Sequence, residues 1–490
     1  MDADGARSPS VAADPDRIDP ALRRLTFTLI IGALAVIFDT TIMSVAIDDL
    51  AGRMHARPAT IQWVSTAYLL ALATVMPAVG WLQAVLGGKR LWIAALGMFF
   101  AGSLLCATAW NAPSLIAFRV VQGFGGGIMM VLMTTLIMQA AKGRSIGRVM
   151  SLITVPTALG PVIGPVIGGV ILHVGDWRWI FLFNVPFCVV GAYLAARNLP
   201  RDRPGPRPRL DVVGMLLLSP GVVAVIYGLT GIGGSQGPTA LTVGLPLVAG
   251  LALLLGYVGW ALRRGPDALI DVRLFRHRAL ASSSALVFLS GAALYGTMML
   301  LPLYWQQVRG EDALGAALLL IPQGVGTLVS RAIAGRYMDR FGPRPVAIVA
   351  FVLTCAATVP FGFVTASTGN TALMAALFVR GIGLGAAMVT IMGAAFVGLE
   401  PEEIPQGSGI SRVAQQIGGS AGTALLVMIL QRTSTGAHTP AALASGFGNA
   451  FWWATAFTAA AVPLCLLLPG RPDPQPRARD AAPVEEPSGV

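Results

Sequence analysis

The chain has 490 residues, of which 55% are hydrophobic and only 12% charged, and its mean hydropathy is +0.72. This composition excludes an ordinary soluble domain and is typical of an all-α protein that crosses a membrane many times. The net charge of +11 would suggest a nucleic-acid partner in a soluble protein, but basic loops on the cytoplasmic side of a membrane account for it here, so we expect no nucleic-acid partner.

Fourteen apolar segments, each about as long as a membrane-spanning helix, follow a polar leader. Residues 1–24 predict a disordered cytoplasmic segment rather than a signal peptide, because the apolar run after them is too long for one. Residues 471–490, rich in proline and mixed charges, predict a second disordered cytoplasmic tail. The expected spans are 25–47, 62–82, 91–110, 115–139, 149–172, 179–197, 211–231, 241–262, 279–303, 312–333, 346–366, 371–397, 409–431 and 448–468.

The first of these spans contains a carboxylate. Asp39 lies in a segment, Leu25 to Ile47, that is otherwise uncharged. A helix rises about 1.5 Å per residue, which places Asp39 about 20 Å from Leu25 and past the middle of a bilayer core. An ionised group at that depth costs several kcal/mol and marks a candidate functional site, although a purely structural pairing with a polar neighbour is the alternative.

Basic residues are distributed unevenly between the two sides of the predicted bundle. With the N-terminus inside, 25 of the 34 lysine and arginine residues fall in inner segments, 5 in outer loops and 4 in or at the ends of spans. Cytoplasmic loops of membrane proteins carry such an excess. We therefore expect a multi-pass protein of the cytoplasmic membrane with both termini in the cytoplasm.

Three sequence patterns recur at nearly constant distance. The pairs are Gly80–Arg90 with Gly335–Arg344 (255 positions apart), Phe118–Gly126 with Val379–Gly385 (261), and Gly164–Gly169 with Gly418–Gly422 (254). Internal repeats of this kind are typical of transporters built from two related halves. The long offset predicts two six-span bundles separated by one additional hairpin. The expected units are 25–200 (first bundle), 201–278 (two inserted spans with linkers) and 279–470 (second bundle).

These motifs resemble the major facilitator superfamily, and within it the fourteen-span drug:proton antiporters. The resemblance covers residues 25 to 468 and includes Asp39–Ile42 in the first span, Gln62–Tyr68 in the second and Trp177–Phe181 before the sixth. It implies a major facilitator fold of 14 helices (6+2+6) and, for Asp39 and Arg119, a role in proton coupling. It also implies roles for two groups of residues. The gating residues of the inner loops are Gly80, Gly87, Lys89, Arg90, Gly335, Asp339, Arg340, Gly342 and Arg344; the antiporter motif of the fifth span is Gly160, Pro161, Gly164, Pro165, Gly168 and Gly169.

One departure from the family pattern concerns the first inner loop. Ala84 and Val85 stand where the family usually carries an acid and a base, which are implied to latch the cytoplasmic helix ends. The second copy keeps Asp339 and Arg340. We therefore expect the latch to depend mainly on the second copy.

Other polar and adaptable residues in the spans are candidates for a substrate cavity. Methionine suits surfaces that accept several ligands, and uncharged amides within spans seek partners. The candidates are Tyr68, Gln122, Met130, Tyr295, Gln306 and Gln415. Arg331 and Arg380 lie near span edges, from which their side chains can snorkel to the interface, and Arg380 is the repeat partner of Arg119.

The function that this pattern predicts is proton-coupled export of amphipathic drugs or antibiotics by alternating access. An importer or uniporter of the same fold is the alternative, and an integral membrane enzyme is a more distant one, because no connection is long enough to form a catalytic domain. We expect no cofactor besides the proton and no metal, since the four cysteines lack metal or disulfide spacing. The expected partners are a small substrate and membrane lipid, with the monomer as the functional unit.

Overall fold

The computed structural model describes residues 19–54, 56, 58–142, 146–202, 209–232, 239–311, 313–365, 367–434 and 439–470. Within these ranges every regular element is a helix, so the all-α prediction is confirmed. The predicted disordered ends fall largely outside them: 1–18 and 471–490 are not among the described residues.

The first half of the chain forms one helical bundle. The helices are α1 (Pro20–Arg53), α2 (Pro58–Val75) continued by η1 (Met76–Ala78) and α3 (Val79–Leu86), α4 (Gly88–Ala107), α5 (Ala112–Ala141), α6 (Ile146–Val174), α7 (Arg178–Leu182) and α8 (Asn184–Asn198). Local capping supports the boundaries: the side chain of Asn111 accepts from the backbone N–H of Ser114 at 2.8 Å at the start of α5.

A hairpin and a second bundle follow. The hairpin is α9 (Val212–Ile232), η2 (Ala240–Gly244) and α10 (Leu245–Arg264), and the short turns η3 (Gly265–Asp267) and η4 (Val272–Arg276) lead out of it. The second bundle is α11 (Arg278–Gln307), α12 (Ala313–Leu319), α13 (Ile321–Phe341), α14 (Pro343–Gly362), α15 (Asn370–Ala394), α16 (Ile404–Ser434) and α17 (Pro440–Cys465).

Eleven helical segments of the described residues are long and apolar enough to cross a membrane. A multi-pass membrane protein is therefore confirmed. Helices α6, α12–α13 and α17 lie where the other three spans are expected but are not among the eleven. The count of fourteen stays a prediction.

Two connections at one end of the molecule have the same backbone conformation. Gly87, between α3 and α4, has φ 84°, and Gly342, between α13 and α14, has φ 86°. Positive φ is readily adopted only by glycine. In both loops the glycine N–H bonds to the carbonyl four residues earlier, at 2.8 Å and 2.9 Å. The two glycines lie 255 positions apart in the sequence, so their shared conformation supports the internal repeat. We call the end of the molecule that contains both loops the motif end.

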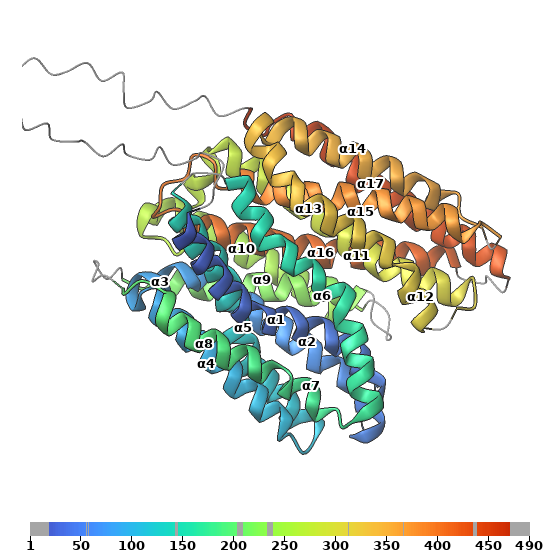
Figure 1. The fold of residues 1–490 in the computed structure, drawn as a ribbon, viewed down its shortest axis with the longest axis horizontal. Coiled ribbons are helices and arrows are strands. Elements are labelled where there is room, and N and C mark those ends of the chain that lie inside the picture. Colours follow the sequence, from blue (N-terminus) through green and yellow to red (C-terminus); the bar gives the residue numbers. More distant parts are fainter. Residues whose placement is uncertain are drawn as a thin grey trace, which may run out of the picture.

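The two bundles meet at the motif end and diverge toward the opposite end (Figure 1). Helix α6 of the first half packs on α13 and α15 of the second, and α3 and α5 pack on α16. The tightest approach is between Gly147 and Gly335, where a Cβ on Gly147 would meet the carbonyl carbon of Gly335 at 3.1 Å and clash with its oxygen. The structure is therefore closed at the motif end.

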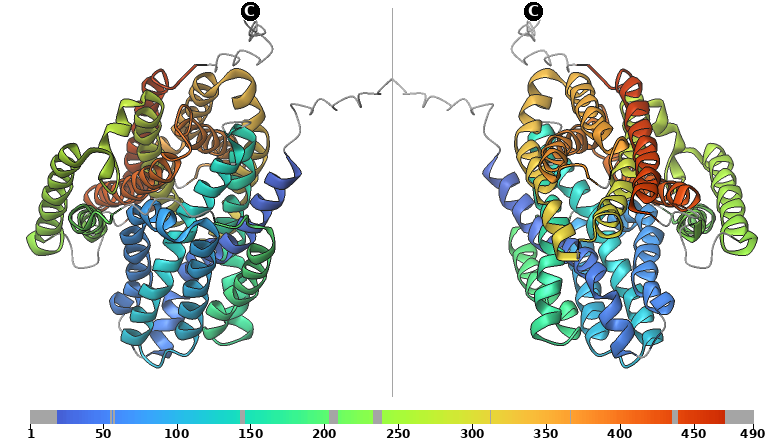
Figure 2. Two further views of the ribbon diagram at one scale, coloured as in Figure 1. Left: turned by 90° about the vertical axis from the view of Figure 1, so that its left-hand side faces the viewer. Right: turned by 90° about the vertical axis from the view of Figure 1, so that its right-hand side faces the viewer.

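The hairpin α9–α10 lies at one side of the molecule, outside both bundles (Figure 2). Helix α9 contacts α2 of the first half and α16 of the second, with the rings of Trp63 and Tyr227 5.7 Å apart. The buried carboxylate of Asp211 holds the hairpin together by accepting from Trp260 Nε1 at 2.9 Å and from the N–H of Leu269 at 3.1 Å.

Helices α4 and α5 approach so closely that side chains are excluded at the contact. A Cβ on Gly125 would lie 2.7 Å from Phe99 N and 2.8 Å from Ala95 O, whereas one on Gly97 of α4 meets nothing within 4 Å.

We expect Gly125→Ala to lower the free energy of unfolding by about 1–3 kcal/mol through overpacking. Gly97→Ala is the matched control and should leave stability unchanged or slightly raised. Thermal unfolding of the purified protein in detergent measures both; equal midpoints would contradict the packing described.

Candidate functional site

A buried network surrounds Asp39 inside the first bundle. Its carboxylate forms an ion pair with Arg119, at 2.6 Å between Oδ2 and Nη1. The other oxygen, Oδ1, accepts hydrogen bonds from the amides of Gln122 and Asn184, each at 2.9 Å. Gln122 also donates to Ser103 at 2.8 Å. Asp39 and Arg119 are each only 1% exposed.

Five helices contribute to this network: α1 (Asp39), α2 (Tyr68), α4 (Ser103), α5 (Arg119 and Gln122) and α8 (Asn184). The guanidinium lies over the Tyr68 ring, 4.1 Å from its centroid, and its Nε donates to Val64 O at 3.2 Å. Removing one partner of a buried ion pair costs about 3–5 kcal/mol, because the other charge is left without compensation. The network therefore ties the packing of the first bundle to the charge on Asp39.

Close packing of α6 against α1 shields the turn of α1 that contains Asp39. Three glycines of the antiporter motif, at intervals of four, face α1: a Cβ on Gly160 would meet Ile37 at 2.5 Å, one on Gly164 would meet Thr41, and one on Gly168 would meet Ile42 O at 3.1 Å. Gly169 faces no atom within 4 Å. These glycines thus pack within the first half, and earlier turns of α6 make its contact with the second half. Pro161 and Pro165 lie in the same stretch of α6.

The second half has an arginine but no carboxylate at the corresponding place. Arg380 is 2% exposed and donates to Thr358 Oγ1 at 3.2 Å, to Gln323 Oε1 at 2.7 Å and to Thr297 Oγ1. Three acceptors on neighbouring helices hold Arg380 in the interior, so of its two possible roles snorkelling to the interface is excluded, and a functional role as the repeat partner of Arg119 stays a prediction. Proximity of an acid thus distinguishes Arg119 from its repeat partner.

At the motif end, Asp339 of α13 caps α6 of the other half. Its oxygens accept from the backbone N–H groups of Gly147 at 2.8 Å and Arg148 at 3.2 Å, and Arg148 Nε lies 3.5 Å from Oδ2. An acid at a helix N-terminus satisfies free N–H groups and complements the helix dipole. Asp339 lies beyond residue 333, the expected end of its span. Burial raises the pKa of its carboxyl group, and the N–H groups of Gly147 and Arg148, with the charge of Arg148, partly offset this rise.

The first repeat copy makes a neutral contact instead. Gln83, next to Ala84, donates to Gln139 Oε1 at 2.9 Å, and Gln139 donates across to Pro401 O at 3.1 Å. Gly80 faces Pro405 of α16. In the first copy, two hydrogen-bonded glutamine side chains therefore connect the halves in place of the acid that the family usually carries.

The remaining inner-loop residues stabilise the loops within each half. Asp202 accepts from the N–H groups of Lys89 and Arg90, at 2.8 Å and 3.1 Å, and so caps α4. Lys89 Nζ donates to Ala196 O at 2.5 Å. In the second copy, Arg344 donates to Leu468 O at 2.9 Å and Arg340 lies over the Phe341 ring.

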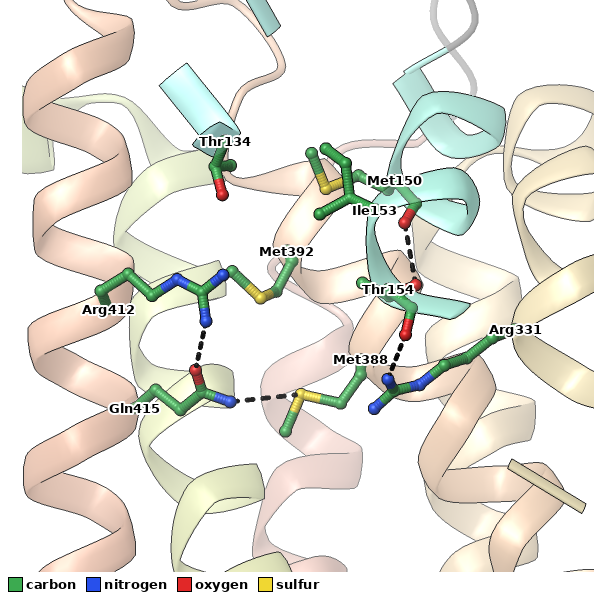
Figure 3. A pocket seen from close by; sticks show the side chains of 9 residues that line it. All are labelled: Thr134, Met150, Ile153, Thr154, Arg331, Met388, Met392, Arg412 and Gln415. Carbon is green, nitrogen blue, oxygen red and sulfur yellow. Dashed lines mark hydrogen bonds between the residues drawn. The ribbon is translucent and has the colours of Figure 1, made fainter. Parts of the chain in front are cut away.

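A cavity of about 50 Å³ lies between the halves, next to the closed motif end (Figure 3). Helices α5, α6, α13, α15 and α16 provide its lining, which combines three methionines with Arg331, Arg412 and Gln415. Arg331 of α13 donates to Thr154 O of α6 across the boundary between the halves. The expectation that Arg331 snorkels to the interface is wrong, since it faces this cavity.

The six residues expected to line a substrate cavity are dispersed. Tyr68 and Gln122 belong to the Asp39 network and are fully buried. Met130 is buried in α5, and Gln306 is exposed at the end of α11. Gln415 lines the cavity between the halves, whereas Tyr295 of α11 is 42% exposed. The sequence did not predict a cavity position for Arg331 and Arg412. The signal that could have indicated them is a cationic side chain within an apolar span.

Two helical bundles that share an internal repeat and are joined by a hairpin are the architecture of many membrane transporters. Residues 29–423 match the Major Facilitator Superfamily. The chain belongs to that superfamily.

Relatives of known sequence agree with this assignment. The chain is 38% identical over 423 residues to "Multidrug resistance protein B homolog" of Mycobacterium tuberculosis (strain ATCC 25618 / H37Rv), covering 85% of this chain and 77% of the relative. It is 28% identical over 425 residues to "Lincomycin resistance protein LmrB" of Listeria monocytogenes, covering 85% and 90%.

Solved structures show the same fold at low identity. The human organic anion transporter MFSD10 (TETRAN) superposes with a TM-score of 0.63 at 14% identity, covering 91% of this chain and 100% of that one. A double-tryptophan mutant of XylE gives 0.65 at 15% identity, covering 92% and 96%.

The buried ion pair generates a prediction about stability. Arg119→Gln leaves the Asp39 carboxylate without its cation and should lower the free energy of unfolding by about 3–5 kcal/mol. Adding Asp39→Asn to that variant should recover a large part of the loss. Thermal unfolding in detergent measures the cycle; a double variant as unstable as the sum of the single variants would contradict coupling between the two charges.

The cap on α6 generates a prediction about the closed motif end. Asp339→Asn should loosen the contact between the halves and expose Met150, which is 1% exposed. In a cysteine-free background with Met150→Cys, maleimide labelling should accelerate several-fold. Asp202→Asn removes an equivalent cap within one half and should leave the labelling rate unchanged. Equal rates in the Asp339 variant and its parent would show that this cap does not hold the halves together.

Proposed function

We propose that the protein is a proton-coupled exporter that moves amphipathic drugs or antibiotics out of the cell by alternating access. The observation that carries the proposal is the buried ion pair of Asp39 and Arg119, because it places one titratable carboxylate in a low-dielectric interior. The names of the relatives in Mycobacterium and Listeria, which refer to multidrug and lincomycin resistance, support the substrate class.

Proton uptake by Asp39 would change the charge balance of the first bundle. Once the carboxylate is neutral, Arg119 retains Gln122 Oε1 at 2.6 Å and Val64 O as acceptors, so its guanidinium can stay buried. The pair thus has two charge states with different internal bonding. A two-state element of this kind can bias the orientation of the bundles.

The distribution of basic residues supports a cytoplasmic position for the motif end and for both termini. The protein then resides in the cytoplasmic membrane, and the present conformation is closed on the inner side and divergent on the outer side. Release of the Asp339 cap on α6 would open the inner side to substrate. The proton is the only coupling agent required, and a monomer surrounded by lipid is the working unit.

Inward protons supply the energy for outward transport. A membrane potential of 100 mV contributes about 2.3 kcal/mol for each charge that crosses, and a pH gradient adds to it. An importer or uniporter of the same fold is the second candidate. Among the described residues, an acid and a cation that are both fully buried pair in the first half and not in the second, and this favours proton exchange over simple uniport.

Asp39→Asn tests the proton site. Asparagine keeps the shape and one acceptor oxygen of the protonated acid, and Arg119 retains Gln122 and Val64 as acceptors, so the variant should insert and fold, although with lower stability because the cation has lost its counter-charge. It should lose drug-dependent proton movement in inverted membrane vesicles, as measured with a pH-sensitive dye. Asp176→Asn, at a half-exposed pair with Arg178, is the control and should retain full exchange. Undiminished exchange in the Asp39 variant would remove Asp39 from the coupling mechanism.

A further inference from the structure

The cavity between the halves is electropositive. Two arginines, Arg331 and Arg412, face it, and no acidic side chain occurs in its lining among the described residues. Their guanidinium groups enter from opposite sides, one on α13 and the other on α16 (Figure 3). The inference below rests on the proposed export function.

Arg412 has unused hydrogen-bonding capacity. Its Nε is buried and has no hydrogen-bond partner in the described part of the chain, and its Nη1 meets Gln415 Oε1 at a long 3.4 Å. A guanidinium group offers five N–H donors. The two arginines that are fully buried in the described part of the chain are satisfied differently: Arg119 by a carboxylate, and Arg380 by three neutral acceptors.

The size of the cavity suits part of a substrate. A site for a whole drug-sized molecule occupies about 300 Å³ or more. The present cavity of about 50 Å³ has room for a small polar group only. Met150, Met388 and Met392 beside it provide an adaptable apolar wall.

We infer that the exported molecules are amphipathic anions, whose acidic group is bound between Arg412 and Arg331 while the apolar part extends along the methionines between the bundles. A carboxylate or sulfonate accepts hydrogen bonds from the N–H groups that Arg412 leaves unused, and these hydrogen bonds are charge-assisted. A cationic amphipath would meet two like charges at the same place.

The substrate charge also decides how transport responds to the membrane potential. Exchange of one outgoing monoanion for one incoming proton moves two positive charges inward, whereas exchange of a monocation for a proton moves none. An anion exporter is therefore driven by the potential as well as by the pH gradient.

A pair of dyes that differ by one acidic group tests this inference. The anion is 1-anilinonaphthalene-8-sulfonate, and the neutral partner is N-phenyl-1-naphthylamine, which has the same ring system without the sulfonate. Binding to the full chain in lipid nanodiscs is measured by fluorescence, after subtraction of empty discs. The variants are Arg412→Gln, Arg331→Gln with Arg412→Gln, and Arg412→Lys. Arg276→Gln, an exposed arginine of η4, is the control.

The glutamine variants should weaken binding of the sulfonate about tenfold or more, because charged hydrogen bonds are lost. Binding of the neutral dye should change by less than about twofold, Arg412→Lys should restore part of the sulfonate affinity, and Arg276→Gln should change neither. Parallel loss of both dyes, or unchanged sulfonate binding, would overturn the anion site. Arg412→Lys keeps the test decisive if the double variant does not fold.

Transport in inverted vesicles separates this inference from the proposed function. If the wild type moves the neutral dye with protons but binds the sulfonate independently of the arginines, export stands and the anion site fails. If arginine-dependent binding of the sulfonate is found without proton-linked movement of either dye, the anion site stands and proton-coupled export fails.

Discussion

The structure of the first bundle depends on how a charge is accommodated inside an apolar interior. An aspartate in the middle of a span is tolerable only with a counter-charge and with donors for its remaining lone pairs. Arg119, Gln122 and Asn184 supply these from α5 and α8, and the glycines of α6 close the same turn of α1 against the surroundings. Because five helices contribute to the network around this carboxylate, the arrangement of the bundle depends on the partners that this network provides.

The two halves repeat a backbone but not a charge pattern. Gly87 and Gly342 turn their loops identically, and Arg119 and Arg380 occupy corresponding spans. An acid remains in the interior of the first half and at the motif end of the second, through Asp339. The first copy instead uses Gln83 and Gln139 at the motif end. The neutral contact costs less to dehydrate, whereas the carboxylate cap forms stronger bonds with the N–H groups of α6.

Much of the fold could be predicted from sequence, because hydropathy and the recurring glycine motifs define spans and halves without knowledge of contacts. The acid in the first span could also be located, since an ionised residue among apolar neighbours is conspicuous in any sequence. Its partner Asn184 could not be located, and neither could Ser103, which accepts from Gln122, because short polar side chains are common in spans and only their arrangement in space reveals them. The same holds for Arg331 and Arg412, which lie 81 positions apart in the sequence and line one cavity only because α13 and α16 of the second bundle both border it opposite α5 and α6 of the first.

The hairpin α9–α10 has a mechanical consequence. Helix α9 contacts both bundles, with Tyr227 beside Trp63 of α2 on one side and with α16 on the other. The N–H of Asp271, in the segment that leaves the hairpin, donates to Gln406 of α16 at 2.9 Å. Any rotation of one bundle against the other must therefore shear at least one of these surfaces. The side chains along α9 thus contribute to the free-energy difference between the two relative orientations of the bundles.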